Sequence, residues 1–424
     1  MKAIQPFFSA RLTVLVLAWI FALTTAAGAQ TYSVIYNFQG LADGADPMAG
    51  LIFGKSGVLY GTGIYGGNYD SCDEGGACGV VFSLTPPAQS GGTWTESAFY
   101  QFQYQDPYPP MSNLVFDKEG NIYGSAGSNG GIDMTLYQLT NVDGSWNLNP
   151  IYSSGQFGTV ATPIIDANTN LYTTVEFSAD GTYDGAVVEV SPQSGGTWTA
   201  NNLYEFQGGN DGDGPTGGVV LYRGKLYGTT ASGGGTSECG TVFELSPQSG
   251  GTWKERVLHA FTGTDGCYPS AGVIFDKSGN MYGTTNTGGG GICTSGCGVV
   301  FELSPPAQEG GAWTETVLLE FNNKNGANPY AALKISSNGM LFGTTLHGGN
   351  GPCEPTGTGC GTVFWLTPPS KSGGAWKHEF HNFQGPDGTE PYGTVLLNES
   401  NHAIYGTTLG GGQNGYGVVF QIAK

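Results

Sequence analysis

A short phrase, in which an aromatic residue is followed by Gly-Thr or a close variant, recurs seven times along this chain of 424 residues. The copies begin at Tyr60, Tyr123, Tyr172, Tyr227, Tyr282, Phe342 and Tyr405. Neighbouring copies are about 50 to 60 residues apart, a period typical of β-propellers and solenoids. The chain is therefore expected to fold as an array of seven related units, although its length alone would suggest two or three domains.

Each repeat predicts four short β-strands, which we call a, b, c and d. In the fifth repeat these are expected at residues 272–276, 281–285, 298–304 and 313–321. Turns and loops rich in Gly, Asn, Ser or Pro separate them, as is usual between short strands. Strand d alternates with a period of two, so that Trp313, Val317 and Phe321 share one face.

The two ends of the repeat array are complementary. The last repeat stops after its strand c, at residues 417–422, whereas residues 32–38 form a strand d that precedes the first strand a. A ring closes if residues 32–38 complete the seventh blade, which leaves only short, protected edges. A solenoid would need a cap at each end. We therefore predict an all-β fold: one seven-bladed β-propeller of four-stranded blades over residues 30–424, closed by the N-terminal strand.

The first 29 residues have the pattern of a secretory signal peptide. Lys2 and Arg11 precede an apolar run over residues 12–23, and small residues follow at Ala27-Gly28-Ala29. The apolar run is short for a membrane span, and no later segment approaches the about 20 apolar residues that one needs. We expect cleavage near Ala29-Gln30 and a protein that is secreted, periplasmic or at the cell surface.

Composition excludes two classes of partner. The formal net charge is −19, and the leader to be removed carries Lys2 and Arg11 but no acid. Such a charge repels phosphate backbones and anionic lipid headgroups, so we expect no nucleic-acid or membrane partner and no membrane span in the mature chain. We expect a monomer.

Two phrases carry a resemblance to a known family: Gly279-Asn-Met-Tyr-Gly-Thr-Thr285 and Gly298-Val-Val-Phe-Glu-Leu-Ser-Pro305. They resemble the GloVer (Gloeo/Verruco-type) tandem repeat of secreted bacterial β-propeller-like proteins. The resemblance covers nearly all of residues 30–424, is strongest in repeats 1 and 4–7, and implies no particular activity. Family members often carry one of several C-terminal surface anchors; this chain departs from that pattern, because it ends at Lys424 with no anchor, so surface attachment is not carried over from the family.

Eight cysteines in an exported chain predict disulfides. Three pairs fall within single b–c loops: Cys72–Cys78, Cys293–Cys297 and Cys353–Cys360. The remaining two lie in a b–c loop and the next d–a loop, which share a face of a propeller, so Cys239–Cys267 is expected to join neighbouring blades. The alternative is a four-cysteine zinc site built from the loops of blades 5 and 6.

The d–a loops share an acidic pattern, in which an Asp stands four residues before a Pro. It occurs at Asp43, Asp211, Asp265 and Asp387. The Asp either caps a turn that Gly and Pro complete, or contributes to a ligand or cation site on that face. We expect no cofactor or metal; calcium at Asp211 and Asp213, in an Asp-Gly-Asp-Gly segment, is the alternative. The candidate ligand contacts are Asp211, Asp213, Asp265 and Asp387.

Tyrosines follow Pro where strand a begins, at Tyr108, Tyr330 and Tyr392, near the expected mouth of the central channel. A tyrosine ring can stack on a sugar and donate a hydrogen bond, or it can simply pack between blades. These three residues are the candidate aromatic ligand contacts.

Catalytic machinery is not evident in the sequence. A Gly-x-Ser-x-Gly elbow is absent, and the spacing of the 33 acidic residues singles out no glycosidase-like pair, so no catalytic residue is predicted. The leading interpretation is a non-enzymatic binding or structural propeller that recognises a glycan or a cell-envelope protein through its loop-rich face. The alternative is a carbohydrate-active enzyme, a lyase or hydrolase, with acidic residues near the channel mouth.

Overall fold

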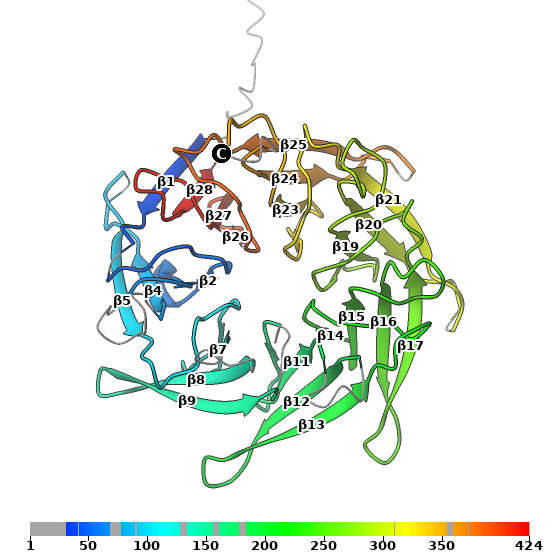
Figure 1. Ribbon diagram of the computed structural model, residues 1–424, viewed down its shortest axis with the longest axis horizontal. Helices are drawn as coiled ribbons and strands as arrows, with labels where there is room; N and C mark the ends of the chain where they lie inside the picture. The colour runs from blue at the N-terminus through cyan, green and yellow to red at the C-terminus, as the bar shows by residue number, and fades with distance from the viewer. Residues whose placement is uncertain are drawn as a thin grey trace, which may run out of the picture.

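The computed structural model describes residues 31–40, 42–67, 78–89, 91–127, 134–155, 161–177, 184–308, 310–353, 359–371 and 373–423. These residues form seven four-stranded antiparallel sheets arranged in a ring, with strand a nearest the centre and strand d outermost (Figure 1). The predicted seven-bladed propeller is confirmed. The helical content of the described residues is the single 3₁₀ turn η1 (Lys55–Gly57), and none of them forms a helix able to cross a membrane.

The strands of each blade lie side by side in the order a-b-c-d. Blade 1 contains β2 (Ile52–Phe53), β3 (Leu59–Gly63), β4 (Val80–Thr85) and β5 (Thr95–Gln101). Blade 2 contains β6 (Val115–Phe116), β7 (Ile122–Gly127), β8 (Met134–Val142) and β9 (Ser145–Ser153). Blade 3 contains β10 (Ile164–Ile165), β11 (Leu171–Val175), β12 (Ala186–Pro192) and β13 (Trp198–Glu205). Blade 4 contains β14 (Val220–Tyr222), β15 (Lys225–Thr230), β16 (Thr241–Pro247) and β17 (Trp253–Ala260).

The last three blades complete the ring. Blade 5 contains β18 (Ile274–Phe275), β19 (Met281–Thr285), β20 (Val299–Ser304) and β21 (Thr314–Glu320). Blade 6 contains β22 (Lys334–Ile335), β23 (Leu341–Thr345), β24 (Thr362–Thr367) and β25 (Lys377–Asn382). Blade 7 contains β26 (Leu396–Asn398), β27 (Ala403–Thr408), β28 (Val418–Ala423) and, as its strand d, β1 (Thr31–Asn37).

The ring closes as the sequence predicts. Strand β1 pairs antiparallel with β28, with Thr31 opposite Ala423 and Asn37 opposite Val418 (Figure 1). Phe38, directly after β1, is fully buried in a cluster with blade 1 residues such as Phe82. The first and last strands of the array therefore form one sheet, and that sheet packs against the first complete blade.

Strand c carries the core of each blade. In blade 5, Val299, Val300, Phe301 and Leu303 have no exposed surface. Because neighbouring blades pack on both faces of the sheet, apolar residues follow one another on strand c and do not alternate with polar ones. This explains the recurring Val-Val-Phe sequence.

The glycine of the Tyr-Gly-Thr phrase makes room for the aromatic ring of strand c. A Cβ atom at Gly283 would lie 2.5 Å from Cζ of Phe301, its partner on β20. The same pairing occurs at Gly61 with Phe82, Gly228 with Phe243, Gly343 with Phe364 and Gly406 with Phe420. Blade 3 is instructive, because Thr173 replaces the glycine there and the partner is the smaller Val188. The phrase is a packing motif.

In blades 3 to 7 the threonine at the end of the phrase joins the blade to the next one. Thr229 Oγ1 of blade 4 donates to the carbonyl of Ala271 at the entry to blade 5, at 2.9 Å. Across the closure, Thr407 of blade 7 donates in the same way to the carbonyl of Ala49, at 2.8 Å. The repeated phrase therefore specifies the interfaces between blades as well as the strands.

Three of the four predicted disulfides are present: Cys239–Cys267, Cys293–Cys297 and Cys353–Cys360. The first joins the b–c loop of blade 4 to the d–a loop that enters blade 5. Cys72 lies outside the described residues, so the Cys72–Cys78 pair is not described. The alternative of a zinc site in blades 5 and 6 is wrong, because the sulfur atoms of those cysteines are bonded to one another.

Candidate binding face

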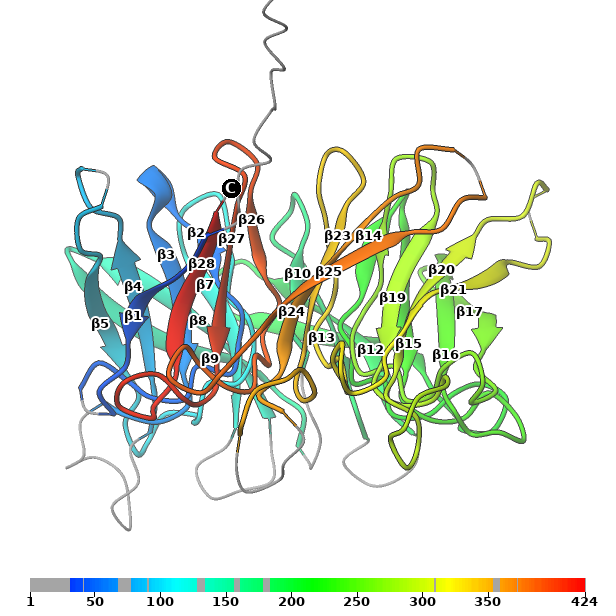
Figure 2. The same cartoon turned by 90° about the horizontal axis from the view of Figure 1, so that it is seen from above.

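The b–c and d–a loops lie on one face of the ring, and the a–b and c–d turns lie on the other (Figure 2). This separation follows from the antiparallel order of the strands. The b–c loop starts at the end of strand b, and the d–a loop, which leads to strand a of the next blade, starts at the end of strand d. In an antiparallel blade these two strand ends lie on the same side. All the residues predicted as ligand contacts belong to d–a loops. We call this side the loop face and the opposite side the turn face.

The acidic residues of the Asp-x-x-x-Pro pattern hold turns on the loop face. Asp265 accepts a hydrogen bond from the backbone N–H of Thr262 at 2.8 Å, and its other oxygen lies 3.0 Å from His259 Nε2. The same arrangement joins Asp43 to Gln39 and Tyr36, Asp211 to Gln207 and Tyr204, and Asp387 to Gln384 and His381. These contacts match the turn-capping interpretation, because the carboxylates already bind groups of their own loop and of the preceding strand d.

Asp213 has a different environment from Asp211. Burial raises the pKa of its carboxyl group, and the negative charges of Asp184, Glu176 and Glu238 raise it further. In the part of the chain that the structure describes, however, no group of three or more His, Cys, Asp or Glu side chains is arranged to hold a metal ion. The calcium alternative at Asp211 and Asp213 therefore gains no support from these residues.

Two of the three predicted tyrosines meet. Tyr330, at the entry to blade 6, and Tyr392, at the entry to blade 7, have ring centroids 4.3 Å apart with the planes tilted by 40°. Both are half-buried, and burial together with the hydrogen bond to Tyr330 raises the pKa of the Tyr392 phenol. Tyr108 packs elsewhere, against the apolar cluster between blades 1 and 2.

Sequence reasoning missed the aromatic side chains that are most exposed. Among the described residues, five aromatic residues are between 42% and 51% exposed: Tyr65, Tyr104, Phe177, Tyr268 and Tyr416. All five belong to b–c or d–a loops and therefore to the loop face. The only available signal was their position in loops, since exposure depends on what packs beside each ring.

Tyr268 is held in a conformation that bulky residues rarely adopt. Its φ is 61°, in the left-handed region, and it directly precedes Pro269. The equivalent positions before Pro carry Asp46, Gly214, Asn328 and Glu390, also with positive φ. Gly, Asn and Asp tolerate this region, whereas tyrosine does so at a cost. The adjacent Cys267 disulfide and a hydrogen bond from the Tyr268 N–H to the Cys239 carbonyl, at 2.9 Å, hold the backbone there.

The residues before Pro also bring acids together on the loop face. Asp46 leads into blade 1 and Glu390 into blade 7. Burial raises the pKa of the Asp46 carboxyl group, and the negative charge of Glu390 raises it further. The backbone N–H of Asp46 bonds to the carbonyl of the exposed Tyr416, at 3.0 Å. Hydrogen-bond acceptors and an exposed ring thus lie next to one another.

The sequence profile of the Gloeobacter/Verrucomicrobia repeat matches residues 131–311 and 290–424. The chain belongs to this repeat family. No curated protein matches the chain in sequence.

Solved structures similar to this member of the family share only the propeller fold with it. A fungal alcohol oxidase in complex with copper is 14% identical, with a TM-score of 0.53 over 93% of this chain and 76% of the oxidase. A protein from Lactobacillus plantarum is also 14% identical, with a TM-score of 0.50 over 80% of this chain and 87% of that protein. An α-L-arabinofuranosidase of Fusarium graminearum is 13% identical, with a TM-score of 0.46 over 92% and 97% of the two chains. Propellers host unrelated functions, so these similarities assign none.

Proposed function

We propose that this protein is a non-enzymatic binding propeller that is exported and recognises a glycan through its loop face. The observation that carries the proposal is the placement of its exposed aromatic residues. Tyr65, Tyr104, Phe177, Tyr268 and Tyr416 all lie on one face, whereas the exposed large apolar residues of the other face, Val142 and Leu221, are aliphatic. Loops on a rigid scaffold are the usual location of binding residues.

The chemistry of this face suits a sugar. A tyrosine presents an apolar ring that can cover the C–H face of a sugar, and a hydroxyl group that can bond to the sugar hydroxyls. Asp46, Asn328 and Glu390 supply acceptors at the positions before Pro. Because the chain carries 33 acidic and only 14 basic residues, we expect it to bind a neutral glycan in preference to an anionic one.

The enzymatic alternative gains no specific support. Three glutamates have carboxyl groups whose pKa is raised to about 7, as is common for general acids: Glu96, Glu255 and Glu315. They lie on the outer strands β5, β17 and β21, each beside the turn-capping Asp of the preceding blade. An arrangement that recurs at three blade interfaces is explained by the repeat and not by one active site.

A glycan array followed by titration calorimetry on the best ligand tests the proposal. Burying one tyrosine ring against a sugar contributes about 1–2 kcal/mol, so Tyr268→Ala and Tyr416→Ala should each weaken binding about tenfold. Val142→Ala and Leu221→Ala are matched controls, because those side chains are comparably exposed on the turn face. If the ligand binds equally well to the tyrosine variants, or if a control variant loses binding, the loop face is not the site. If only an envelope protein is captured, and Tyr268→Ala abolishes its capture, the face is correct but the ligand class is wrong.

A further inference from the structure

Strand d begins with, or next to, a tryptophan in blades 1 to 6. The residues are Trp94, Trp146, Trp198, Trp253, Trp313 and Trp376. Each tryptophan packs on strand b of the preceding blade. Ring centroids are 6.0 Å apart for Trp94 and Tyr405, 5.9 Å for Trp198 and Tyr123, and 6.1 Å for Trp376 and Tyr282. Trp146, Trp253 and Trp313 share apolar clusters with Tyr60, Tyr172 and Tyr227 in the same way. An indole ring thus fills the same place at six of the seven interfaces.

The seventh interface, between blades 6 and 7, differs. Strand d of blade 7 is β1, which runs into Phe38. In four other blades the tryptophan stands eight residues before the corresponding Phe: Trp94 and Phe102, Trp198 and Phe206, Trp253 and Phe261, and Trp313 and Phe321. Eight residues before Phe38 is Gln30, which lies outside the described residues and is not an aromatic residue. On blade 6, Phe342 occupies the strand b position that is tyrosine in the other blades.

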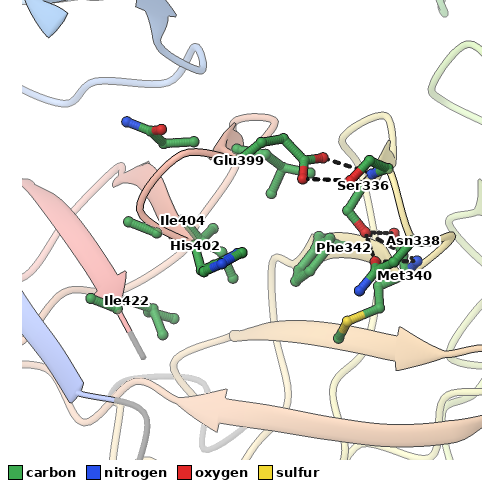
Figure 3. Close-up of a pocket in the computed structure, with 13 residues that line it drawn as sticks. Ser336, Asn338, Met340, Phe342, Glu399, His402, Ile404 and Ile422 are labelled. Carbon is green, nitrogen blue, oxygen red and sulfur yellow. Dashed lines mark hydrogen bonds between the residues drawn. The ribbon is translucent and has the colours of Figure 1, made fainter.

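A pocket of about 470 Å³ lies at this interface, on the turn face. Phe342 and Met340 of blade 6 face Ile404 and His402 of blade 7 across it, and Ile422 of β28 also lines it (Figure 3). The lining around Phe342 is apolar, as the tryptophan environments of the other six interfaces are. Trp365, on the neighbouring strand of blade 6, does not line the pocket; its Nε1 donates to Glu379 of its own blade at 2.6 Å.

The mouth of the pocket is polar, and hydrogen bonds between the two blades stabilise it. Glu399, in the a–b turn of blade 7, accepts hydrogen bonds from the backbone N–H and the hydroxyl group of Ser337 in blade 6, at 2.7 and 2.9 Å (Figure 3). These two bonds connect the turns of the two blades beside the opening. Asn398 and His402 add further polar groups there. A ligand that enters therefore meets hydrogen-bonding groups at the opening and apolar groups farther in.

We propose that this pocket binds a free small molecule with an indole-sized aromatic ring and a polar substituent. The fold itself identifies the ring, because the equivalent place is filled by an indole at every other interface. The volume lies within the range of small-molecule sites and exceeds what a bare ring needs, which leaves room for a substituent at the polar mouth. Phe342 supplies an aromatic partner for the ring, and the carboxylate of Glu399 and the imidazole of His402 can accept hydrogen bonds from it. The site is on the turn face, so it is independent of the proposed glycan site.

The test uses 5-fluoroindole as the probe and fluorine NMR as the measurement, because the seven tryptophans that follow the leader mask fluorescence changes. We expect saturable broadening of the fluorine signal that indole reverses. Phe342→Ala should weaken binding at least about tenfold, because the ring partner is lost. Tyr282→Ala is the matched control, since Trp376 packs on Tyr282 at the next interface, and it should leave binding unchanged.

A second variant protects the test against misfolding of Phe342→Ala. Gln30→Trp supplies the seventh tryptophan at the eight-residue spacing, and it should abolish probe binding while raising the melting temperature. Three results would overturn the proposal: binding that survives both Phe342→Ala and Gln30→Trp, displacement of the probe by N-acetyl-leucinamide as effective as by indole, or no binding at all. Tighter binding of N-acetyl-tryptophanamide than of indole would overturn the proposal of a free ligand and would indicate that the pocket binds a tryptophan side chain of a peptide.

Discussion

Replacing Gly283 with threonine, alone and together with Phe301→Val, measures how strongly the repeated phrase is coupled to the core. A Cβ at position 283 would lie 2.5 Å from Phe301 Cζ, and Phe301 is fully buried, so its ring has nowhere to move. Overpacking of this kind costs about 1–3 kcal/mol. Phe301→Val alone removes most of a buried ring and should cost about 3 kcal/mol.

The double variant reproduces the pair that blade 3 already uses, Thr173 opposite Val188. The threonine methyl group then occupies space that the ring has left, so the total cost should be about 2 kcal/mol, well below the sum of the two single effects. The coupling free energy between the sites is expected to be about 2–4 kcal/mol in favour of the double variant. Guanidinium unfolding followed by tryptophan fluorescence gives all four free energies, provided that the m-values of the variants agree. Additive effects, or a cost below about 0.5 kcal/mol for Gly283→Thr alone, would refute the packing explanation of the phrase.

Two further predictions concern pH and redox state. The carboxyl groups of Glu96, Glu255 and Glu315 have a pKa raised from the ordinary 4.5 to about 7, first by burial and then by the negative charges of Asp43, Asp211 and Asp265 respectively. The folded protein therefore favours the protonated form of these groups. Their contribution to stability should be highest below about pH 4.5 and should fall as the pH rises to 7. Because these side chains are only half-buried, each contributes under about 1 kcal/mol. The variant with Gln at all three positions should melt at a higher temperature than the wild type at pH 8 but not at pH 4. Equal melting temperatures of the two proteins at pH 8 would contradict this. Replacing Cys239 and Cys267 with serine opens a loop with a sequence separation of 28, which should lower the free energy of unfolding in denaturant by about 3 kcal/mol. The same change should weaken the binding of any ligand that contacts Tyr268. Unchanged stability would show that the disulfide does not hold the two blades together.

The fold could be predicted because its signals are local and repeated. Residues 32–38 read as a strand d without its blade, and β28 ends without a strand d, so the pairing of Thr31 with Ala423 follows from counting strands. The turn-capping interpretation of Asp265 was also available from its spacing to Pro269. Its hydrogen bond to His259 was not, because strand d bulges between the residues opposite Val242 and Phe243 and the spacing alone does not place the imidazole.

The binding face could be predicted only in outline. The Pro-Tyr pattern singled out Tyr330 and Tyr392, whose rings do contact each other. The exposure of an aromatic side chain, however, depends on neighbours that are distant in sequence. Tyr416 shows why: its ring lies over Gly40, where a Cβ would come within 2.6 Å of it, and those two residues are brought together by ring closure. The pocket beside Phe342 has the same origin, since Ile422 and Phe342 meet only where the last blade packs against the sixth. The absence of an aromatic residue at position 30 could be counted in the sequence, but the pocket that accompanies it could not be inferred without the structure.

Calorimetric unfolding of a chain that lacks Thr31–Gln39 tests ring closure most directly. The deletion removes β1 from β28 and takes Phe38 out of the core of blade 1. We expect loss of cooperative unfolding, or a melting temperature lowered by at least about 4–6 °C, because about 3–5 kcal/mol is lost with the buried Phe38 ring alone. A truncated chain that unfolds cooperatively at the temperature of the intact protein would contradict closure by the N-terminal strand.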